Sequence, residues 1–275
     1  MRHRVVDFSI GAFVFTLVFC LIFYLAPLVY LLVVALQSSH QFLVNPLTVP
    51  HPAMWGNFST AWKDATMGVY FSNSVIYTGA ATIISVALAV FLAFPVERRY
   101  VRAWNAVYLS MVLGFFLPIG IIPLFIESQM LHLYNNRLGY ILLHVQGGLT
   151  LGFIFFVAYF KTIPRELDES AALDGCGYAR FVFQIVLPLV KPALATVTIY
   201  AAVAVWNDLI GPVVFLANNS LFPLTRGLFT FYGSYQSEWT LLAAGIFIVA
   251  SPLIVAFILL QRSFIQGSLS GSLKL

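Results

Sequence analysis

The sequence predicts an all-α polytopic membrane protein with six transmembrane helices and both termini in the cytoplasm. The first observation is composition: 61% of the 275 residues are hydrophobic and 9% are charged, and the mean hydropathy is +0.93. A soluble domain carries about 25% charged residues, so this chain lacks the polar residues to cover a water-facing surface. The second observation is a series of long runs almost without charge, and the third is the unequal distribution of lysine and arginine between their two sides.

The long apolar runs have the length that a membrane requires. A helix that crosses a bilayer core of about 30 Å needs roughly 20 apolar residues. The fifth run is the shortest, but a helix from Lys191 to Asp208 is roughly 25 Å long at about 1.5 Å per residue, so both side chains can reach opposite surfaces. The predicted spans cover about residues 8–36, 70–96, 105–127, 138–160, 188–208 and 240–262, within a single transmembrane domain over 1–275.

The first run follows two arginines, Arg2 and Arg4, and so has the flanks of a signal peptide. The apolar part of a signal peptide has about 7–15 residues, whereas this run is twice as long. We therefore expect an uncleaved first span.

The basic residues indicate which side of the membrane holds the termini. Six spans place both termini on one side, and eleven lysines and arginines fall there against three on the other side. The eleven are Arg2, Arg4, Arg98, Arg99, Arg102, Lys161, Arg165, Arg180, Lys191, Arg262 and Lys274, and the three are Lys63, Arg137 and Arg226. Cytoplasmic loops are enriched in lysine and arginine, so both termini are predicted to be cytoplasmic. The same asymmetry accounts for the net charge of +4 without a nucleic-acid partner.

The motifs of nucleotide hydrolysis and metal catalysis are absent from the sequence. There is no G-x-x-x-x-G-K-[ST] phosphate loop, and no glycine is followed by lysine. The five histidines show neither H-E-x-x-H nor another ligand spacing. We therefore expect a chain that is not an enzyme and that binds no metal or cofactor of its own.

Few ionisable side chains lie in the predicted spans. Glu127 and Asp208 lie at span ends, and His144 lies within the fourth span. A proton or sodium relay needs such groups at mid-membrane, so the pattern weakens the alternative of a self-sufficient secondary carrier or channel. His144 itself has two interpretations, a hydrogen-bonded residue between helices or a proton relay.

The predicted cytoplasmic loop over 161–187 begins as a short helix. Acidic residues occupy its first turn, and Gly175 is placed to end it. Leu167, Ala171 and Ala172 form a small apolar face, which suits a groove on another protein. The alternative is a helix resting on lipid, but such helices are usually rich in lysine and arginine, and this one is acidic.

Part of this loop has a highly specific spacing. Glu169-Ser170-Ala171 is followed after three residues by Gly175, and after nine more by Ile185-Val186-Leu187-Pro188. This resembles the EAA motif of ABC-importer permease subunits, which runs E-A-A, three residues, G, nine residues, I-x-L-P. The departure is Ser170 in place of the alanine at the motif's second position, a change between small residues that still fits a groove.

The resemblance covers roughly residues 70–274 and is closest to the carbohydrate permeases of the maltose-type class. Within that class it is to the second, MalG-like member of the permease pair. The further matching segments are Leu187–Thr196, Trp206-Asn207-Asp208, Pro223–Gly227 and the tail over 261–274. The tail of that class usually ends Gly-Ala-Val-Lys-Gly, whereas this chain ends Gly-Ser-Leu-Lys-Leu.

The resemblance implies an ABC type I importer transmembrane domain in a bacterial or archaeal cytoplasmic membrane. Its partners would be two copies of a separate ATPase that uses ATP and Mg²⁺, a second and distinct permease, an extracytoplasmic solute-binding protein and membrane lipid. It would move a sugar or oligosaccharide by alternating access. The residues that would contact the ATPase or shape that contact are Glu169, Ser170, Ala171, Asp174, Gly175, Ile185, Leu187 and Pro188.

The solute and its path have open alternatives at this stage. Trp206, Asn207 and Asp208 are candidates for the solute path, because Asn and Asp can hydrogen-bond hydroxyls and Trp can stack on a sugar ring. The other interpretation of Asp208 is an anchor at the end of the span. The same machinery could instead carry a polyol, a glycerol phosphate or an amino acid, since the loop over 161–187 contacts the ATPase and not the solute.

Overall fold

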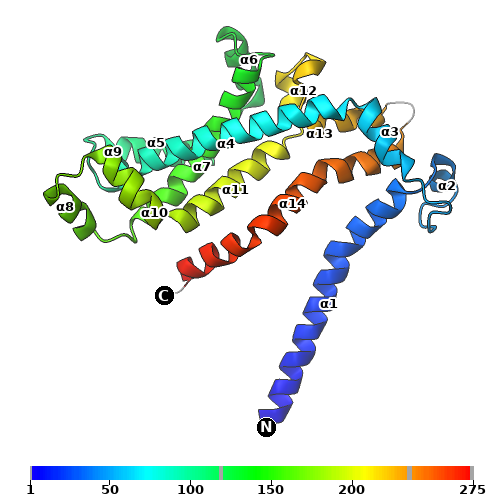
Figure 1. The fold of residues 1–275 in the computed structure, drawn as a ribbon, viewed down its shortest axis with the longest axis horizontal. Helices are drawn as coiled ribbons and strands as arrows, with labels where there is room; N and C mark the ends of the chain where they lie inside the picture. Colours follow the sequence, from blue (N-terminus) through cyan, green and yellow to red (C-terminus); the bar gives the residue numbers. More distant parts are fainter. Residues whose placement is uncertain (1, 118–119, 234–236, 273–275) are drawn as a thin grey trace. The chain divides into compact units, whose positions relative to one another are not determined.

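The computed structural model describes residues 2–117, 120–233 and 237–272, with side chains for 13–117, 120–178, 180–233 and 237–258. Within these residues the chain is helical and has no strand (Figure 1). The longer helices are α1 (Arg2–Ala35), α4 (Met67–Glu97), α5 (Trp104–Phe116), α6 (Ile121–Met130), α7 (Arg137–Phe160), α11 (Lys191–Trp206) and α14 (Trp239–Ser272). The shorter ones are α2 (Ser39–Val44), α3 (Gly56–Asp64), α8 (Glu166–Leu173), α9 (Tyr178–Phe181), α10 (Leu187–Leu189), α12 (Gly211–Phe215) and α13 (Leu224–Gly227). A π turn covers Val182–Val186, and 3-10 turns cover Asn219–Leu221 and Leu228–Phe231.

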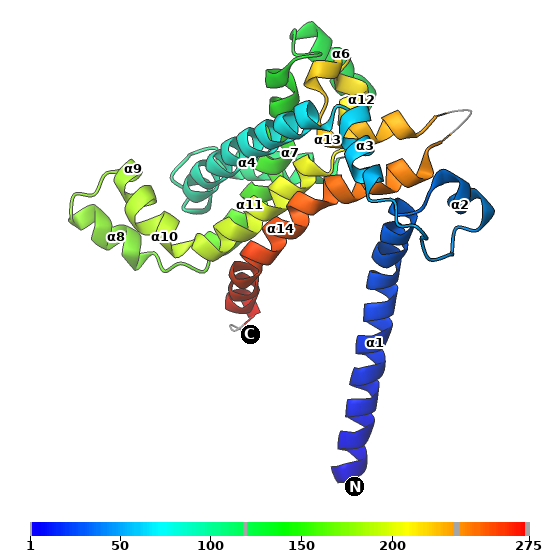
Figure 2. The same ribbon diagram turned by 45° about the vertical axis from the view of Figure 1, so that its right-hand side comes forward.

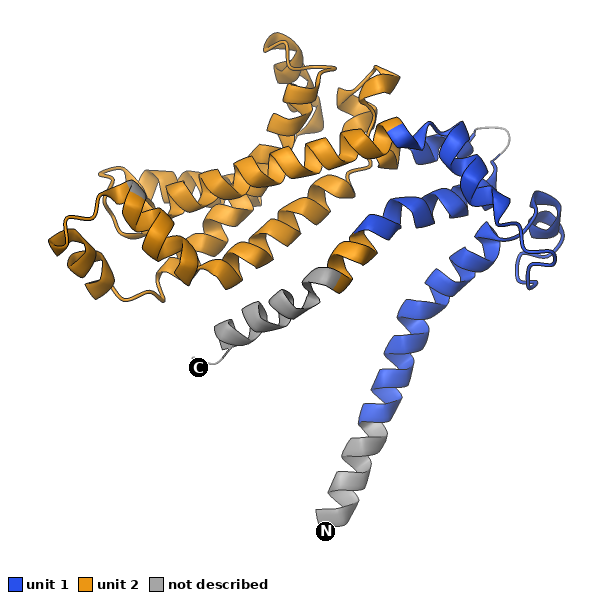
Figure 3. Cartoon of the chain, in the orientation of Figure 1, with its two compact units in different colours: residues 1–68, 227–252 blue, residues 69–226, 253–275 orange. Residues whose placement is uncertain are grey.

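The chain forms two compact units, coloured separately in Figure 3. The first contains residues 1–68 and 227–252, and the second contains residues 69–226 and 253–275. Both regions to which the sequence analysis assigns a function, the loop over 161–187 and residues 206–208, belong to the second unit.

Four helical stretches in the described part of the chain are long and apolar enough to cross a membrane. They are Phe13–Ala35, Met67–Glu97, Arg137–Phe160 and Trp239–Ile258, which overlap the first, second, fourth and sixth predicted spans. Two further pairs of helices qualify if each bent pair is counted as one span. The count of six therefore stays a prediction, and the tail beyond residue 272 lies outside the described residues.

The predicted third and fifth spans are not straight helices. The chain bends by 118° between α5 and α6, and Pro118 lies between them in the sequence. It bends by 79° between Val182–Leu189 and α11. Prolines 188 and 192 stand on either side of that second bend, and each removes a backbone donor that a continuous helix would need. The fifth predicted span, 188–208, therefore contains a straight helix only from Lys191 to Trp206.

Two glycines on α7 set how closely the helices of the second unit pack. A Cβ added to Gly148 would lie 2.9 Å from the Cβ of Ser85 on α4, and one added to Gly152 would lie 3.0 Å from the Cβ of Ala89. On the other side, the added atom at Gly152 would lie 3.1 Å from Val197 on α11. Small residues four apart allow close backbone approach where lipid supplies no hydrophobic driving force. Helix α7 therefore occupies the space between α4 and α11.

Aromatic side chains close one end of this packing. The buried Phe94, near the end of α4, lies 5.3 Å from the ring of Phe160 on α7 and 5.5 Å from that of Phe181 on α9. The apolar core continues from there through Val182, Val186 and Val190 to α11. Figures 1 and 2 show α8, α9 and α10 together at this end of the unit, away from α6 and α12.

The first unit is held by capping and by side-chain bonds to the backbone. Ser38 and Gln41 form a capping box at the start of α2, so two orphan backbone donors are satisfied. The amide of Gln37 donates to the carbonyl of Thr48 at 2.6 Å, and that of Asn57 donates to the carbonyl of Ala35 at 2.8 Å. These bonds tie the 45–54 connection and the start of α3 to the end of α1.

Candidate functional site

The acidic helix predicted in the loop is α8, with Glu166, Asp168 and Glu169 in its first turn. Arg165 stands at its N-cap and makes no side-chain capping bond. Negative charge near the unpaired N–H groups of a helix start is favourable, by about 0.3–1 kcal/mol per residue at exposed sites. The charges of the acidic residues therefore favour this end of the helix, although no side chain caps it by a hydrogen bond.

Gly175 ends α8, as predicted, through a Schellman motif. Its φ is +69°, a conformation in which a Cβ would crowd the backbone. Its N–H donates to the carbonyl of Ala172 at 3.1 Å, and the N–H of Cys176 donates to that of Ala171 at 2.9 Å. These are the two bonds of the motif, and they satisfy carbonyls that the helix end leaves open.

One residue of the apolar face predicted for α8 packs inward and not toward a partner. Ala171 is buried against the chain's own core, beside Phe181 and Val182, so it does not face outward. The outward side carries Glu169, Ala172 and Leu173, and the Leu173 side chain is 89% exposed. A leucine exposed to this extent beside a carboxylate gives α8 a surface with both an apolar and a charged contact point.

Ser170 fits the second position of the motif, where the family has alanine, because the helix satisfies its hydroxyl. The hydroxyl donates to the carbonyl of Glu166, one turn earlier, at 2.6 Å. The hydroxyl donor of a serine that bonds to its own helix in this way is already satisfied. Asp174, the C-cap of α8, is exposed.

The other motif residues lie where the chain leaves the loop. Ile185 and Leu187 are partly buried and pack against the core. The N–H of Leu187 donates to Val182, five residues earlier, which closes the π turn. Pro188 is exposed and lies in the first turn of α10, directly after the π turn. These residues fix the exit of the loop into α11.

A contact absent from the sequence analysis holds the start of α8. Arg98, directly after α4, forms an ion pair with Asp168, in which Nε of Arg98 and Oδ2 of Asp168 are 2.6 Å apart. No periodicity or motif pairs two residues so distant in the chain. The one sequence signal is an arginine directly after an apolar run, and the enrichment of basic residues on the cytoplasmic side already accounts for it.

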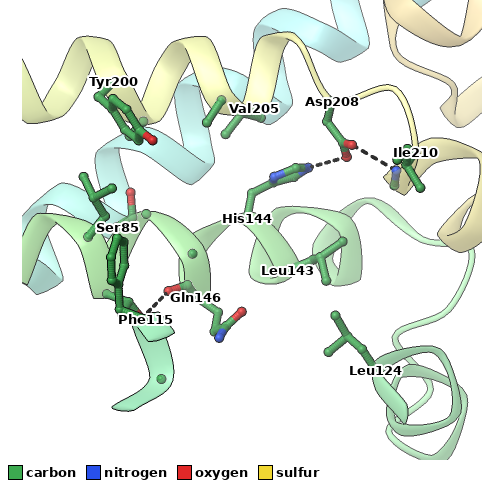
Figure 4. A pocket seen from close by; sticks show the side chains of 18 of the residues that line it. Ser85, Phe115, Leu124, Leu143, His144, Gln146, Tyr200, Val205, Asp208 and Ile210 are labelled. Carbon is green, nitrogen blue, oxygen red and sulfur yellow. Dashed lines mark hydrogen bonds and ion pairs between the residues drawn. The ribbon is translucent and has the colours of Figure 1, made fainter. Parts of the chain in front are cut away.

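A cavity of about 550 Å³ lies in the second unit, among α5, α6, α7, α11 and α12 (Figure 4). Most of its lining is apolar, as is usual for small-molecule sites, whose volumes are about 300–1,000 Å³. The polar side chains that line it are Ser85, His144, Gln146, Thr150, Tyr200 and Asp208. His144 and Asp208 point toward each other on the wall of the cavity, as Figure 4 shows.

Asp208 is held by three elements at once. Its Oδ2 accepts a hydrogen bond from the hydroxyl of Tyr140 at 2.8 Å and lies 3.2 Å from Nε2 of His144, both on α7. Its Oδ1 accepts from the N–H of Gly211 at 2.9 Å, at the start of α12. Its own carbonyl accepts from the hydroxyl of Thr225 at 2.7 Å. The carboxylate thus anchors the turn after α11 and also lines the cavity.

The two other candidates for the solute path lie elsewhere. Trp206 is buried, and its ring lies 6.0 Å from that of Phe71 in an edge-to-face arrangement. Asn207 is exposed, and neither residue lines the cavity. Of the Trp206-Asn207-Asp208 segment, only Asp208 is brought to the cavity. His144, Gln146 and Tyr200 join it there, and of these the sequence analysis considered His144 alone.

The apolar helices and the family match together identify the chain as a membrane transport subunit. Residues 85–266 match the family of inner membrane components of binding-protein-dependent transport systems. The match covers more than half of the chain and contains both the loop and the cavity, and the chain belongs to this family. It is a multi-pass ABC transporter permease of the cytoplasmic membrane.

Named relatives and a solved structure are similar over nearly the whole chain. The diacetylchitobiose uptake system permease protein NgcG of Streptomyces coelicolor is 30% identical over 250 residues, which cover 90% of this chain and 82% of that protein. The melibiose/raffinose/stachyose import permease protein MelC of Bacillus subtilis is 30% identical over 228 residues, or 82% and 83% of the two chains. A chain of a bacterial ABC transporter that imports the acidic polysaccharide alginate has the same fold, with a TM-score of 0.79 over 95% of this chain and 97% of that chain, at 20% identity.

Proposed function

We propose that this chain is a permease subunit of a binding-protein-dependent importer for a sugar or oligosaccharide, powered by a separate ATPase. Family membership supports the importer class, and the names of NgcG and MelC support a saccharide as the solute. The observation that carries the coupling role is the outward face of α8, with Leu173 89% exposed on a helix whose Ala171 is buried in the core.

The proposed topology has six spans with both termini in the cytoplasm. The bent pairs α5–α6 and Val182–α11 then count as the third and fifth spans. The eleven-to-three distribution of basic residues supports this orientation, in which α8 lies on the cytoplasmic side, where ATP is available.

The outward face of α8 is the proposed docking surface for the ATPase. Glu169 and Leu173 offer a charge and an apolar anchor, and Asp174 lies beside them. Ala171, Ile185 and Leu187 pack against the core, and Gly175 ends α8, so their proposed role is to hold α8 in place. Two ATPase copies, a second and distinct permease and an extracytoplasmic binding protein complete the proposed importer.

The cavity is the proposed solute path on this chain. Gln146 and Tyr200 have exposed side chains on its lining and can hydrogen-bond hydroxyl groups. The rings of Phe115 and Tyr200 offer apolar faces to a sugar ring (Figure 4). Asp208 has most of its acceptor sites occupied, so its main role here is to shape the wall, with His144 beside it.

The test is purification of the tagged chain from its native membrane, followed by uptake assays in vesicles. We expect an ATPase with a phosphate loop and a second permease to co-purify, and ATP-dependent uptake of a labelled di- or oligosaccharide. Glu169→Lys and Gly175→Pro should abolish uptake without preventing membrane insertion. Arg102→Glu, an exposed charge reversal outside the loop, is the control and should leave uptake unchanged.

Other results would point to the alternatives. Uptake of a polyol, a glycerol phosphate or an amino acid in place of a saccharide would keep the machinery and change the solute. Uptake that persists without any ATPase and depends on a proton or sodium gradient would overturn the importer proposal.

A further inference from the structure

The guanidinium of Arg98 joins the end of α4 to the first turn of α8. Besides the contact of Nε with Oδ2 of Asp168, its Nη2 donates to Oδ1 of the same carboxylate at 3.2 Å and to the carbonyl of Ile163 at 3.1 Å. The hydroxyl of Tyr100 donates to Oδ2 of Asp168 at 3.1 Å. The planar fork of an arginine matches a carboxylate in one orientation, which a lysine cannot do.

This pair is buried, with side-chain exposures of 2% for Arg98 and 8% for Asp168. A third charge, Glu97, lies 3.1 Å from Nη1 of the same guanidinium. Buried ion pairs contribute little net stability, because desolvation offsets their attraction. The two-bonded contact of this arginine with a carboxylate does restrict their relative orientation. Burial and the charge of Asp168 raise the pKa of the Tyr100 hydroxyl, which therefore stays protonated and continues to donate. The arrangement is better explained by positioning than by stability.

The position of α8 makes such a contact mechanically relevant. The helix is joined to the rest of the chain by the short connections 161–165 and 174–177, which contain turns and no helix. Turns can absorb a displacement by changing a few backbone angles. The side-chain attachments of α8 are the contacts of Asp168 with Arg98 and Tyr100 and the burial of Ala171. The contact with Arg98 is the charged, two-bonded link to the end of α4.

The other end of that link is embedded in the core. The guanidinium of Arg98 lies 5.6 Å from the centre of the Phe94 ring, which packs on Phe160 of α7 and Phe181 of α9. A displacement of α8 carried through Arg98 therefore reaches α4 and α7, and both run past the cavity at Ser85 and His144.

We propose that Arg98 is a positioning residue for energy coupling, which holds α8 on α4 so that movement of the docked helix is transmitted to the cavity. This rests on the proposed function, in which α8 binds the ATPase. Breaking the pair should leave the outward face of α8 intact and the ATPase bound, while the cavity loses its response to nucleotide.

The test measures the response of the cavity to nucleotide without a solute. Ala204, which lines the cavity and is exposed, is changed to cysteine in a Cys20→Ser, Cys176→Ala background. The complex with its ATPase is reconstituted in vesicles. The rate of modification by a charged thiol reagent is then compared without nucleotide and after trapping with ATP and vanadate. The parent complex should show a clear change of rate between the two states.

In Arg98→Gln and in the nearly isosteric Asp168→Asn, we expect the ATPase to co-purify as in the parent. The nucleotide-dependent change in modification rate should fall by about tenfold, within the usual 5–150-fold range of coupling between sites. The charge-swapped double variant Arg98→Asp, Asp168→Arg should restore part of the response. Arg102→Gln, an exposed arginine in the same connection, should behave as the parent.

The possible failures are distinguishable. A full nucleotide response in Asp168→Asn with the ATPase bound would overturn the role of the pair. Loss of the ATPase in both single variants, with no rescue by the charge swap, would make the pair merely structural and also overturn it. An ATPase that does not bind the parent chain would instead overturn the proposed function.

Discussion

The hydroxyl of Tyr140 donates to Oδ2 of Asp208 at 2.8 Å, and this bond joins α7 to the turn after α11. Tyr140 is 2% exposed, so its hydroxyl has no access to water as an alternative partner. The same carboxylate caps α12 through Gly211, and a Cβ added to that glycine would overlap the carboxylate. One side chain thus organises three helices next to the cavity.

Removing this carboxylate should destabilise the chain. Asp208→Ala leaves the Tyr140 hydroxyl unsatisfied and uncaps α12, which we expect to cost about 1–3 kcal/mol. Asp208→Asn keeps an acceptor of the same shape and should cost less. Thermal unfolding of the purified complex checks this order. Equal midpoints for Asp208→Ala and the parent would contradict the anchoring role, and a Tyr140→Phe, Asp208→Ala double variant should show non-additive losses.

Cavity side chains should affect solute affinity more than stability. Gln146→Ala and Tyr200→Ala remove exposed polar groups from the lining without opening the core. We expect a higher KM for the transported saccharide with little change in the unfolding midpoint, because both side chains are exposed. Asn207→Ala, exposed but outside the cavity, is the matched control and should leave KM unchanged. An altered KM in the control alone would indicate that the solute path lies on the other side of the turn after α11.

Helix packing in the second unit should depend on the close approach at Gly148. A Cβ there would lie 2.7 Å from Oγ and 2.9 Å from Cβ of Ser85, so Gly148→Ala forces α4 and α7 apart. Overpacking of this kind typically costs about 1–3 kcal/mol. Gly79→Ala on α4 has no atom within 4 Å of the added group and serves as the control. Similar unfolding midpoints for the two variants would show that α7 is not confined at this glycine.

Local features were predictable because their physical cause is local. Gly175 could be identified as a helix end from its place after an acidic amphipathic turn, and the structure gives it the positive φ that makes glycine suitable. The long apolar runs likewise identify α4 and α7, because the length and apolarity that a membrane demands are visible in sequence.

Long-range features were not predictable from a single chain. The contact of Arg98 with Asp168 depends on how α4 and α8 are placed, and no spacing encodes it. Ala171 was assigned to the outward face because helical periodicity shows which residues share a face but not what that face meets. The bend before α11 was not predicted, because the apolar run over 188–208 gives the length of a span and not its direction, and Pro188 and Pro192 stand on either side of the bend.

The left-handed conformation of Gly175 leads to a local prediction. Gly175→Ala places a Cβ at φ +69°, which costs about 1–2 kcal/mol. We expect faster hydrogen exchange at the amides of residues 175 and 176, whose bonds close the end of α8. Gly177→Ala, two residues later and with open space around it, should leave that exchange unchanged. Equal protection in both variants would mean that the turn does not depend on glycine.

The two alanines of α8 separate its inner and outer faces. Ala171 is 6% exposed and packs into the core, so Ala171→Leu should overpack it and cost about 1–3 kcal/mol of stability. Ala172 is exposed, so Ala172→Leu should change stability by less than about 0.5 kcal/mol. Because Ala172 shares the outward side with Leu173, its larger replacement should instead weaken co-purification of the ATPase. Both quantities are measured on the same two preparations. Ala171→Leu should lower the unfolding midpoint, whereas Ala172→Leu should keep the midpoint and lower the yield of co-purified ATPase. A loss of ATPase with Ala171→Leu at an unchanged midpoint would place the docking face on the side that the core now covers.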